Sequence, residues 1–129
     1  MLRMEEGFGE LHLAAYRKLL PGGPWSPDRA GPSSPAEISE LENYLAYFAT
    51  LQVLRTQGLL TLETIDRIFA YRFFIAVNNP HTSQMLKKNR DYWQLLYTLY
   101  RDWVKLRNNQ NALVPQEQYP LGFDDGGAD

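Results

Sequence analysis

The ten residues from Ile68 to Val77 read IFAYRFFIAV and carry nine non-polar or aromatic side chains and one charge, at Arg72. A helix at a protein surface shows one apolar stripe with polar residues opposite. A helix made of this stretch would be apolar on nearly every side, so other elements must enclose it. The stretch therefore predicts the central helix of a small all-α bundle.

Length and composition indicate one small domain and exclude several classes of protein. The chain has 129 residues, which is the usual size of one domain and enough to bury a core without disulfides or metals. It contains no cysteine, which excludes disulfide scaffolds, thiolate zinc sites and cysteine nucleophiles. Its net charge of −2 creates no global field that would attract nucleic acid or an anionic membrane. The aromatic share of 13% is high, and such rings can serve a core or an adhesive surface.

No targeting or membrane segment is recognisable in the sequence. The first six residues, MLRMEE, lack the basic start and apolar centre of a secretory signal. The longest apolar run is shorter than the roughly 20 residues that a membrane-spanning helix needs. We therefore expect a soluble cytoplasmic protein without a membrane partner.

The chain before the central helix divides into a helix, a loop and a second helix. Apolar residues at helical spacing predict the first helix over about residues 5–20. Residues 21–35 hold five prolines and three glycines, which predict an irregular loop. A loop of this length is either functional or flexible, and we favour flexible. Trp25 is its one large apolar residue and could fasten it to the core.

The second helix has clear signals at both ends. Ser34 precedes Pro35 and stands three residues before Glu37, which predicts a capping box with proline at the first helical position. Gly58 is suited to the left-handed conformation that often ends a helix. The connection to the central helix is short, so we expect these two helices to lie antiparallel and in contact.

The remaining elements are marked by caps and by apolar periodicity. Thr61 can cap the central helix, which should end at Asn78, and Asn79 followed by Pro80 repeats the capping signal. We predict a short helix over 80–88, a long helix over 90–108 and an irregular acidic tail over 109–129. The sequence thus predicts a single all-α domain, residues 1–129, with four to five helices.

Residues suited to catalysis are few. His12 and His81 are the only histidines, and neither has a second imidazole or a carboxylate at ligand spacing. We expect a half-buried or solvated His12 and a solvated His81. Paired carboxylates lie at helix starts or in the tail, where the helix dipole and solubility explain them. No phosphate loop, nucleophile elbow or zinc-binding helix motif occurs. We therefore expect a protein that is not an enzyme, with no metal site and no cofactor.

Arg72 is the strongest single candidate for a binding residue. Its stem can lie along apolar surface while its guanidinium reaches a partner, and a buried unpaired charge is costly. One interpretation is a structural arginine bonded to a loop or to the tail. The other is a binding arginine in an aromatic pocket with Tyr71 and Tyr97, taking a partner protein or a small anionic ligand.

Charge is unevenly distributed along the second half of the chain. Residues 81–107 contain six basic and two acidic residues, a net charge of +4, whereas residues 108–129 carry −4. The basic 87–107 strip is interleaved with aromatic rings, which is typical of a weak nucleic-acid footprint. A basic helix followed by an acidic tail is also self-complementary. The nucleic-acid candidates are Lys87, Lys88, Arg90 and Trp93.

Four segments together resemble a known group of proteins. They are ENYLAYF (42–48), GLL (58–60), FAYRFF (69–74) and the helix from Asp91 to Trp103. They resemble a family of small all-helical bacterial proteins of unknown function, in which an asparagine-aromatic helix, a glycine-leucine turn and a phenylalanine-tyrosine-arginine helix recur. The likeness covers about Glu37 to Arg107. It implies a helical fold and a bacterial or phage origin, and it implies no reaction, cofactor or site residue.

The functional expectation is a non-enzymatic small interaction or regulatory protein. It would act through protein–protein contacts, presenting aromatic surface to another protein or to a second copy of itself as a homodimer. The reason is the lack of catalytic residues alongside more aromatic rings than so small a core should need. The alternatives are a nucleic-acid-binding accessory protein and a protein that binds a small anion at Arg72.

Overall fold

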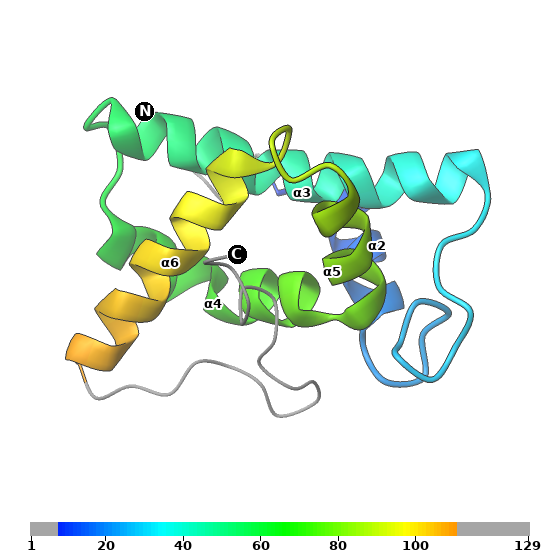
Figure 1. The fold of residues 1–129 in the computed structure, drawn as a ribbon. Helices are drawn as coiled ribbons and strands as arrows, with labels where there is room; N and C mark the ends of the chain where they lie inside the picture. Colours follow the sequence, from blue (N-terminus) through cyan, green and yellow to red (C-terminus); the bar gives the residue numbers. More distant parts are fainter. Residues whose placement is uncertain (1–7, 111–129) are drawn as a thin grey trace.

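The computed structural model describes residues 8–110, and this part of the chain forms a single bundle of five α-helices (Figure 1). No strand occurs within these residues, which confirms the predicted all-α fold. Of the predicted 109–129 tail, residue 109 ends the last helix and residues 111–129 lie outside the described part. The helices are α2 Glu10–Leu19, α3 Pro35–Thr56, α4 Leu62–Asn78, α5 Pro80–Lys88 and α6 Gln94–Asn109.

Helix α4, which contains the IFAYRFFIAV stretch, lies at the centre of the bundle. It packs against each of the other four helices. Its last six residues, 73–78, are all buried, as the apolar stretch predicts. Its first half is less enclosed: Arg67 is exposed and Tyr71 is 52% exposed. The prediction of enclosure on every side is therefore wrong for this half. Helices α2 and α6 lie on either side of Arg67 and Tyr71, and this face of α4 is left uncovered between them.

Aromatic rings make up much of the core. Phe73 stacks on Trp103 with 4.7 Å between ring centroids, and Phe48 meets Phe69 edge-to-face at 5.8 Å. Among the aromatic residues of 8–110, Tyr71 and Tyr92 alone are exposed. The expectation of surplus rings on the surface is therefore wrong for this part of the chain. The buried rings are Phe8, Trp25, Tyr44, Phe48, Phe69, Phe73, Phe74, Trp93, Tyr97, Tyr100 and Trp103.

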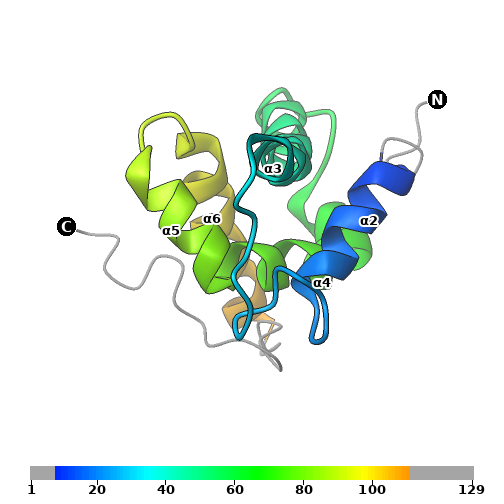
Figure 2. The ribbon, with the colours of Figure 1, turned by 90° about the vertical axis from the view of Figure 1, so that its right-hand side faces the viewer.

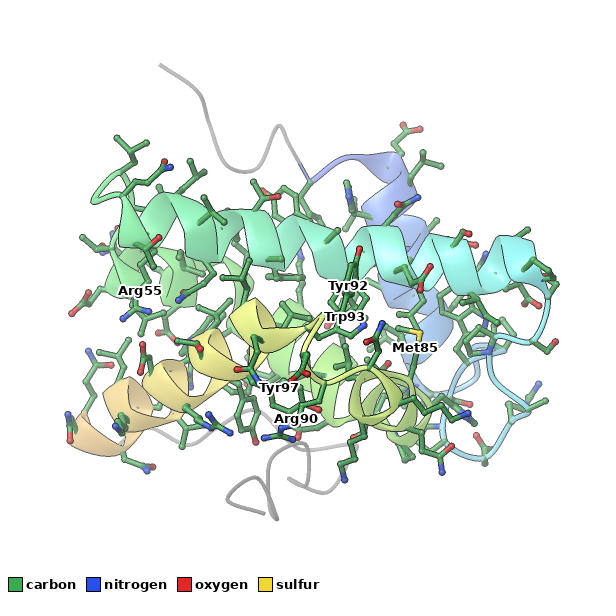
Figure 3. The ribbon with its side chains drawn as sticks, turned by 45° about the horizontal axis from the view of Figure 1, so that its top comes forward. Arg55, Met85, Arg90, Tyr92, Trp93 and Tyr97 are labelled. Atoms are coloured by element: carbon green, nitrogen blue, oxygen red, sulfur yellow. The ribbon has the colours of Figure 1, made fainter. Side chains whose placement is uncertain are left out.

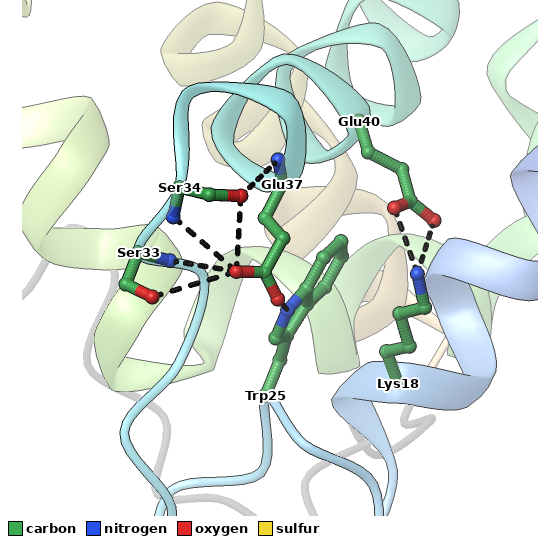
Figure 4. Close-up of polar contacts among 6 residues, drawn as sticks. All are labelled: Lys18, Trp25, Ser33, Ser34, Glu37 and Glu40. Atoms are coloured by element: carbon green, nitrogen blue, oxygen red, sulfur yellow. Dashed lines mark hydrogen bonds and ion pairs between the residues drawn. The ribbon is translucent and has the colours of Figure 1, made fainter.

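The predicted capping box at the start of α3 is present and extends into the loop (Figure 4). The Ser34 hydroxyl accepts from the Glu37 backbone N–H at 3.1 Å, and the Ser34 N–H donates to the Glu37 carboxylate at 3.2 Å. The Ser33 backbone and the Trp25 indole N–H donate to the same carboxylate at 3.4 and 3.3 Å. These bonds lower the pKa of Glu37 from 4.5 to about 2, the Ser34 backbone contributing most. Glu37 therefore joins the helix start to the loop.

The other predicted helix ends are also present. Gly58 adopts φ +78°, and the N–H groups of Gly58 and Leu59 bind the carbonyls of Arg55 and Leu54, which is a Schellman motif. The Thr61 hydroxyl caps α4 by accepting from Thr64 N–H at 3.2 Å. The short α3–α4 connection thus follows from local signals.

Two predicted helix starts differ from the structure. Helix α2 begins at Glu10, because Gly9 is extended; the predicted residues 5–7 lie outside the described part. Helix α6 begins at Gln94 and not near Arg90. Residues 90–93 form turns, in which Trp93 N–H binds the Arg90 carbonyl at 3.1 Å, three residues back. Bonds of this kind tighten the chain and delay the α-helix by one turn.

The proline-rich loop is fastened to the core rather than free of it. Trp25 is fully buried, and its carbonyl accepts from the Asn79 side-chain amide at 2.9 Å. The His81 ring is within 3.1 Å of the Ser26 carbonyl, so the expected solvated histidine is in fact half-buried and bonded. Gly31 has φ +81°, and a Cβ there would come within 2.7 Å of the His81 ring. The structure thus shows an anchored loop where we expected a flexible one.

Replacing Trp25 by alanine should release this loop. We expect Trp25→Ala to lower the free energy of unfolding by about 3–5 kcal/mol, since it leaves a cavity where a large ring was fully buried. The measurement is urea denaturation followed by circular dichroism. Leu11→Ala is the control, because Leu11 is 82% exposed and should change stability by less than about 0.5 kcal/mol. Equal effects of the two variants would contradict the anchoring role.

Glu37 should make stability depend on pH in the acid range. Its folded-state pKa is about 2 against 4.5 ordinarily, so its contribution is complete above pH 4.5 and is lost as pH falls toward 2. We expect Glu37→Gln to be less stable than the wild type at pH 7 and to approach it at pH 2 in thermal unfolding. Glu42→Gln, at an exposed position on α3, should show no such convergence.

Candidate functional site

Helix α3 forms a ridge with a hollow on each side. Viewed end-on, it stands above the bundle with α2 on one side and α5 and α6 on the other (Figure 2). The hollow between α2 and α3 has a volume of about 890 Å³, and that between α3 and α6 about 220 Å³. A third hollow, of about 450 Å³, borders the exposed half of α4.

The hollow between α3 and α6, which we name the α3–α6 trough, has an entirely apolar or aromatic lining. Small alanines on α3 leave space, and the turn before α6 places Tyr92 and Trp93 against them (Figure 3). Tyr92 is 72% exposed and Leu95 is 42% exposed. Large apolar side chains thus meet solvent beside a hollow. The lining residues are Ala46, Ala49, Tyr92, Trp93, Leu95 and Leu96.

Polar groups lie along the same two helices beyond the trough. Arg55 of α3 pairs with Asp102 of α6 at 2.9 Å and also donates to Gln52 at 3.2 Å. Both members of this ion pair are partly exposed. An apolar centre with a polar, solvent-accessible edge is the usual anatomy of a protein–protein contact surface.

The larger hollow, between α2 and α3, includes charged side chains in its lining. The Lys18 ammonium reaches from α2 to both oxygens of Glu40 on α3, at 2.7 and 2.9 Å (Figure 4). His12 lies half-buried in the lining, its Nδ1 accepting from Gly9 N–H at 3.3 Å, and burial lowers its pKa. An ion pair thus already spans this hollow.

Arg72 lies on aromatic rings, as one interpretation of the sequence expects, but not on the predicted ones. Its guanidinium lies 4.9 Å from the Phe8 ring centre and 5.9 Å from that of Phe69. Its backbone carbonyl accepts from the buried Tyr44 hydroxyl at 2.7 Å, and burial raises the pKa of Tyr44. Tyr71 borders the same hollow as Arg72.

Tyr97 does not join Arg72 and Tyr71. It is fully buried on α6, and the guanidinium of Arg90 lies 3.9 Å from its ring centre (Figure 3). The expected pocket of Arg72, Tyr71 and Tyr97 is therefore not formed. Sequence spacing could not exclude it, because residues 72 and 97 lie on different helices.

The basic 87–107 strip is only partly available to a ligand. Lys87 and Lys88 are exposed at the end of α5. Arg90 covers Tyr97, and Arg107 pairs with Asp66 at 2.8 Å. Trp93 is buried, so its ring offers no open face on which a base could stack. Of the four nucleic-acid candidates, Lys87 and Lys88 are exposed, Arg90 is half-buried and Trp93 is buried.

Sequence reasoning missed two residues that matter to these surfaces. Asp66 accepts from the Trp103 indole at 2.6 Å and from Arg107 at 2.8 Å, which ties α4 to α6. Ala46 lines the trough, and its small side chain leaves space there. An acidic residue at the edge of an apolar helix could have drawn attention to Asp66, whereas nothing local marks Ala46.

The described residues also bear on metal binding and on membrane insertion. Within residues 8–110, no three His, Asp or Glu side chains are grouped so that they could hold a metal ion. None of the helices described is long and apolar enough to cross a membrane. Comparison with protein-family models, with curated proteins and with solved structures finds no match to this chain. Function must therefore be argued from the surface itself.

Chemical nitration should distinguish the exposed from the buried tyrosines. With tetranitromethane, we expect Tyr71 and Tyr92 to be modified well before Tyr44 and Tyr97, which are both fully buried. Mass spectrometry of tryptic peptides over a time course measures the order. Early nitration of Tyr97 would show that the contact with Arg90 opens in solution.

Proposed function

We propose that this protein is a small non-enzymatic interaction module that binds a helix of a partner protein in the α3–α6 trough. One observation carries the proposal: the exposed side chains of Tyr92 and Leu95 flank a hollow whose lining is wholly apolar or aromatic. Amphipathic helices bind such grooves through apolar anchors three or four residues apart.

The size and lining of the trough favour a protein partner over a small molecule. Its volume of about 220 Å³ is below the roughly 300–1,000 Å³ of small-molecule sites. Burial of apolar area is worth about 25 cal/mol per Å², so covering Tyr92 and Leu95 would contribute directly to affinity. Aromatic side chains of this kind are often the residues that dominate binding energy.

The assignment of the charged residues supports a role without catalysis. The Glu37 carboxylate accepts from Ser34 N–H in the capping box of α3, and that of Glu40 pairs with Lys18. Asp66 accepts from Trp103 and Arg107, and Asp102 pairs with Arg55. Each of these carboxylates already has a structural partner. The family resemblance favours a bacterial or phage origin, and a domain without cysteine suits the cytoplasm.

A substitution in the trough tests the proposal. Helical peptides are selected from a random displayed library against the full wild-type chain, with no selection against any variant. We expect the selected peptides to carry large apolar residues at i and i+3 or i+4. Their dissociation constants should rise at least about tenfold for Leu95→Asp, because a buried charge would face the apolar anchor.

Leu59→Asp is the matched control, since Leu59 is 67% exposed in the α3–α4 connection, outside the trough. It should change peptide affinity by less than about twofold. Sedimentation equilibrium of the wild type tests a second copy as the partner, and a dimer lost in Leu95→Asp would assign the trough to self-association. Peptides that bind both variants equally well would refute the proposal.

A further inference from the structure

The exposed half of α4 carries a second surface that the trough does not share. We name it the arginine hollow, with a volume of about 450 Å³. Tyr16 of α2 borders it on one side and Arg107 of α6 on the other. Three guanidinium groups face one carboxylate here. The residues are Tyr16, Asp66, Arg67, Ile68, Ala70, Tyr71, Arg72 and Arg107.

The one carboxylate does not neutralise the arginine hollow. Asp66 accepts from the Trp103 indole at 2.6 Å and from Arg107 Nε at 2.8 Å, so its charge is matched by Arg107. Within residues 8–110, no carboxylate lies at ion-pair distance from Arg67 or Arg72. Two positive charges therefore remain for a ligand.

Arg72 is held in place while its donors stay available. Its guanidinium lies on the faces of Phe8 and Phe69, at 4.9 and 5.9 Å from the ring centres. Such a contact uses the flat face of the group, whereas its N–H donors lie in the plane. Arg107 is likewise fixed by Asp66. Arg72 and Arg107 are thus ordered before a ligand arrives, which lowers the entropy cost of binding.

Planar guanidinium groups bind phosphate and carboxylate oxygens with two parallel hydrogen bonds. We infer that the arginine hollow binds a small polyanionic ligand through its phosphate or carboxylate oxygens, with Arg67 and Arg72 as the principal donors. The carboxylates can come from a free ligand or from the chain itself, because residues 111–129 contain four acidic residues and no basic residue. They follow α6, whose last turn contains Arg107.

Calorimetric titration of the full chain with pyrophosphate and with citrate tests this inference. We expect both probes to bind, and Arg67→Gln and Arg72→Met each to weaken binding at least about tenfold, the worth of one charge-assisted hydrogen bond. Arg29→Gln is the control for the loss of one charge, since Arg29 is exposed in the loop. It should change affinity by less than about twofold.

Arg67 is exposed, so Arg67→Gln should keep the fold and test the site even if Arg72→Met unfolds.

The double variant Asp124→Asn, Asp125→Asn distinguishes a free ligand from the acidic residues of the same chain. Tighter probe binding in that double variant assigns the hollow to the acidic residues of the same chain, and unchanged binding assigns it to a free ligand. Wild-type affinity in Arg67→Gln, or equal loss in Arg29→Gln, would overturn the site. Peptide binding at the trough is measured independently of anion binding, so either proposal can fail without the other.

Discussion

Burial of the second half of α4 is the constraint on which the rest of the structure depends. Six consecutive residues, 73–78, lie out of reach of solvent, which requires neighbours on every side of a single helix. The four other helices supply them. The helices that surround residues 73–78 do not enclose the first half of α4, so Arg67, Tyr71 and part of Arg72 reach solvent there. The same requirement thus produces both the core and the arginine hollow.

Local signals in the sequence were sufficient for most helix ends, because a cap is made by residues adjacent in the chain. Ser34, Gly58, Thr61 and Asn79 act where their residue types predict. The apolar stretch likewise identified the central helix. Where prediction was wrong, distant residues decide: Tyr97 lies against Arg90 and not Arg72, which depends on how α6 packs. The aromatic rings were counted correctly, but their burial is a property of the whole bundle.

The surfaces were harder to predict than the core, because a hollow is defined by what is small or absent. Ala46 and Ala49 have no chemical signature, yet they create the trough beside Tyr92. Arg72 was recognised from its charge, whereas Arg67 on the same helix was not singled out. Arg107 was counted only in the basic strip, since it joins Arg72 only when α4 and α6 are placed together. Charge on a helix can be read from sequence, but the convergence of charges from two helices cannot.

Asn79 connects three parts of the protein through one side chain. Its carbonyl oxygen accepts from His81 N–H at the start of α5, and its amide donates to the Trp25 carbonyl at 2.9 Å. It also ends α4. Because both halves of one amide are committed, the loop and α5 should open together as one cooperative unit. Amide hydrogen exchange in these two segments would then give one common free energy of opening, and exchange near residue 80 would report on the loop near Trp25.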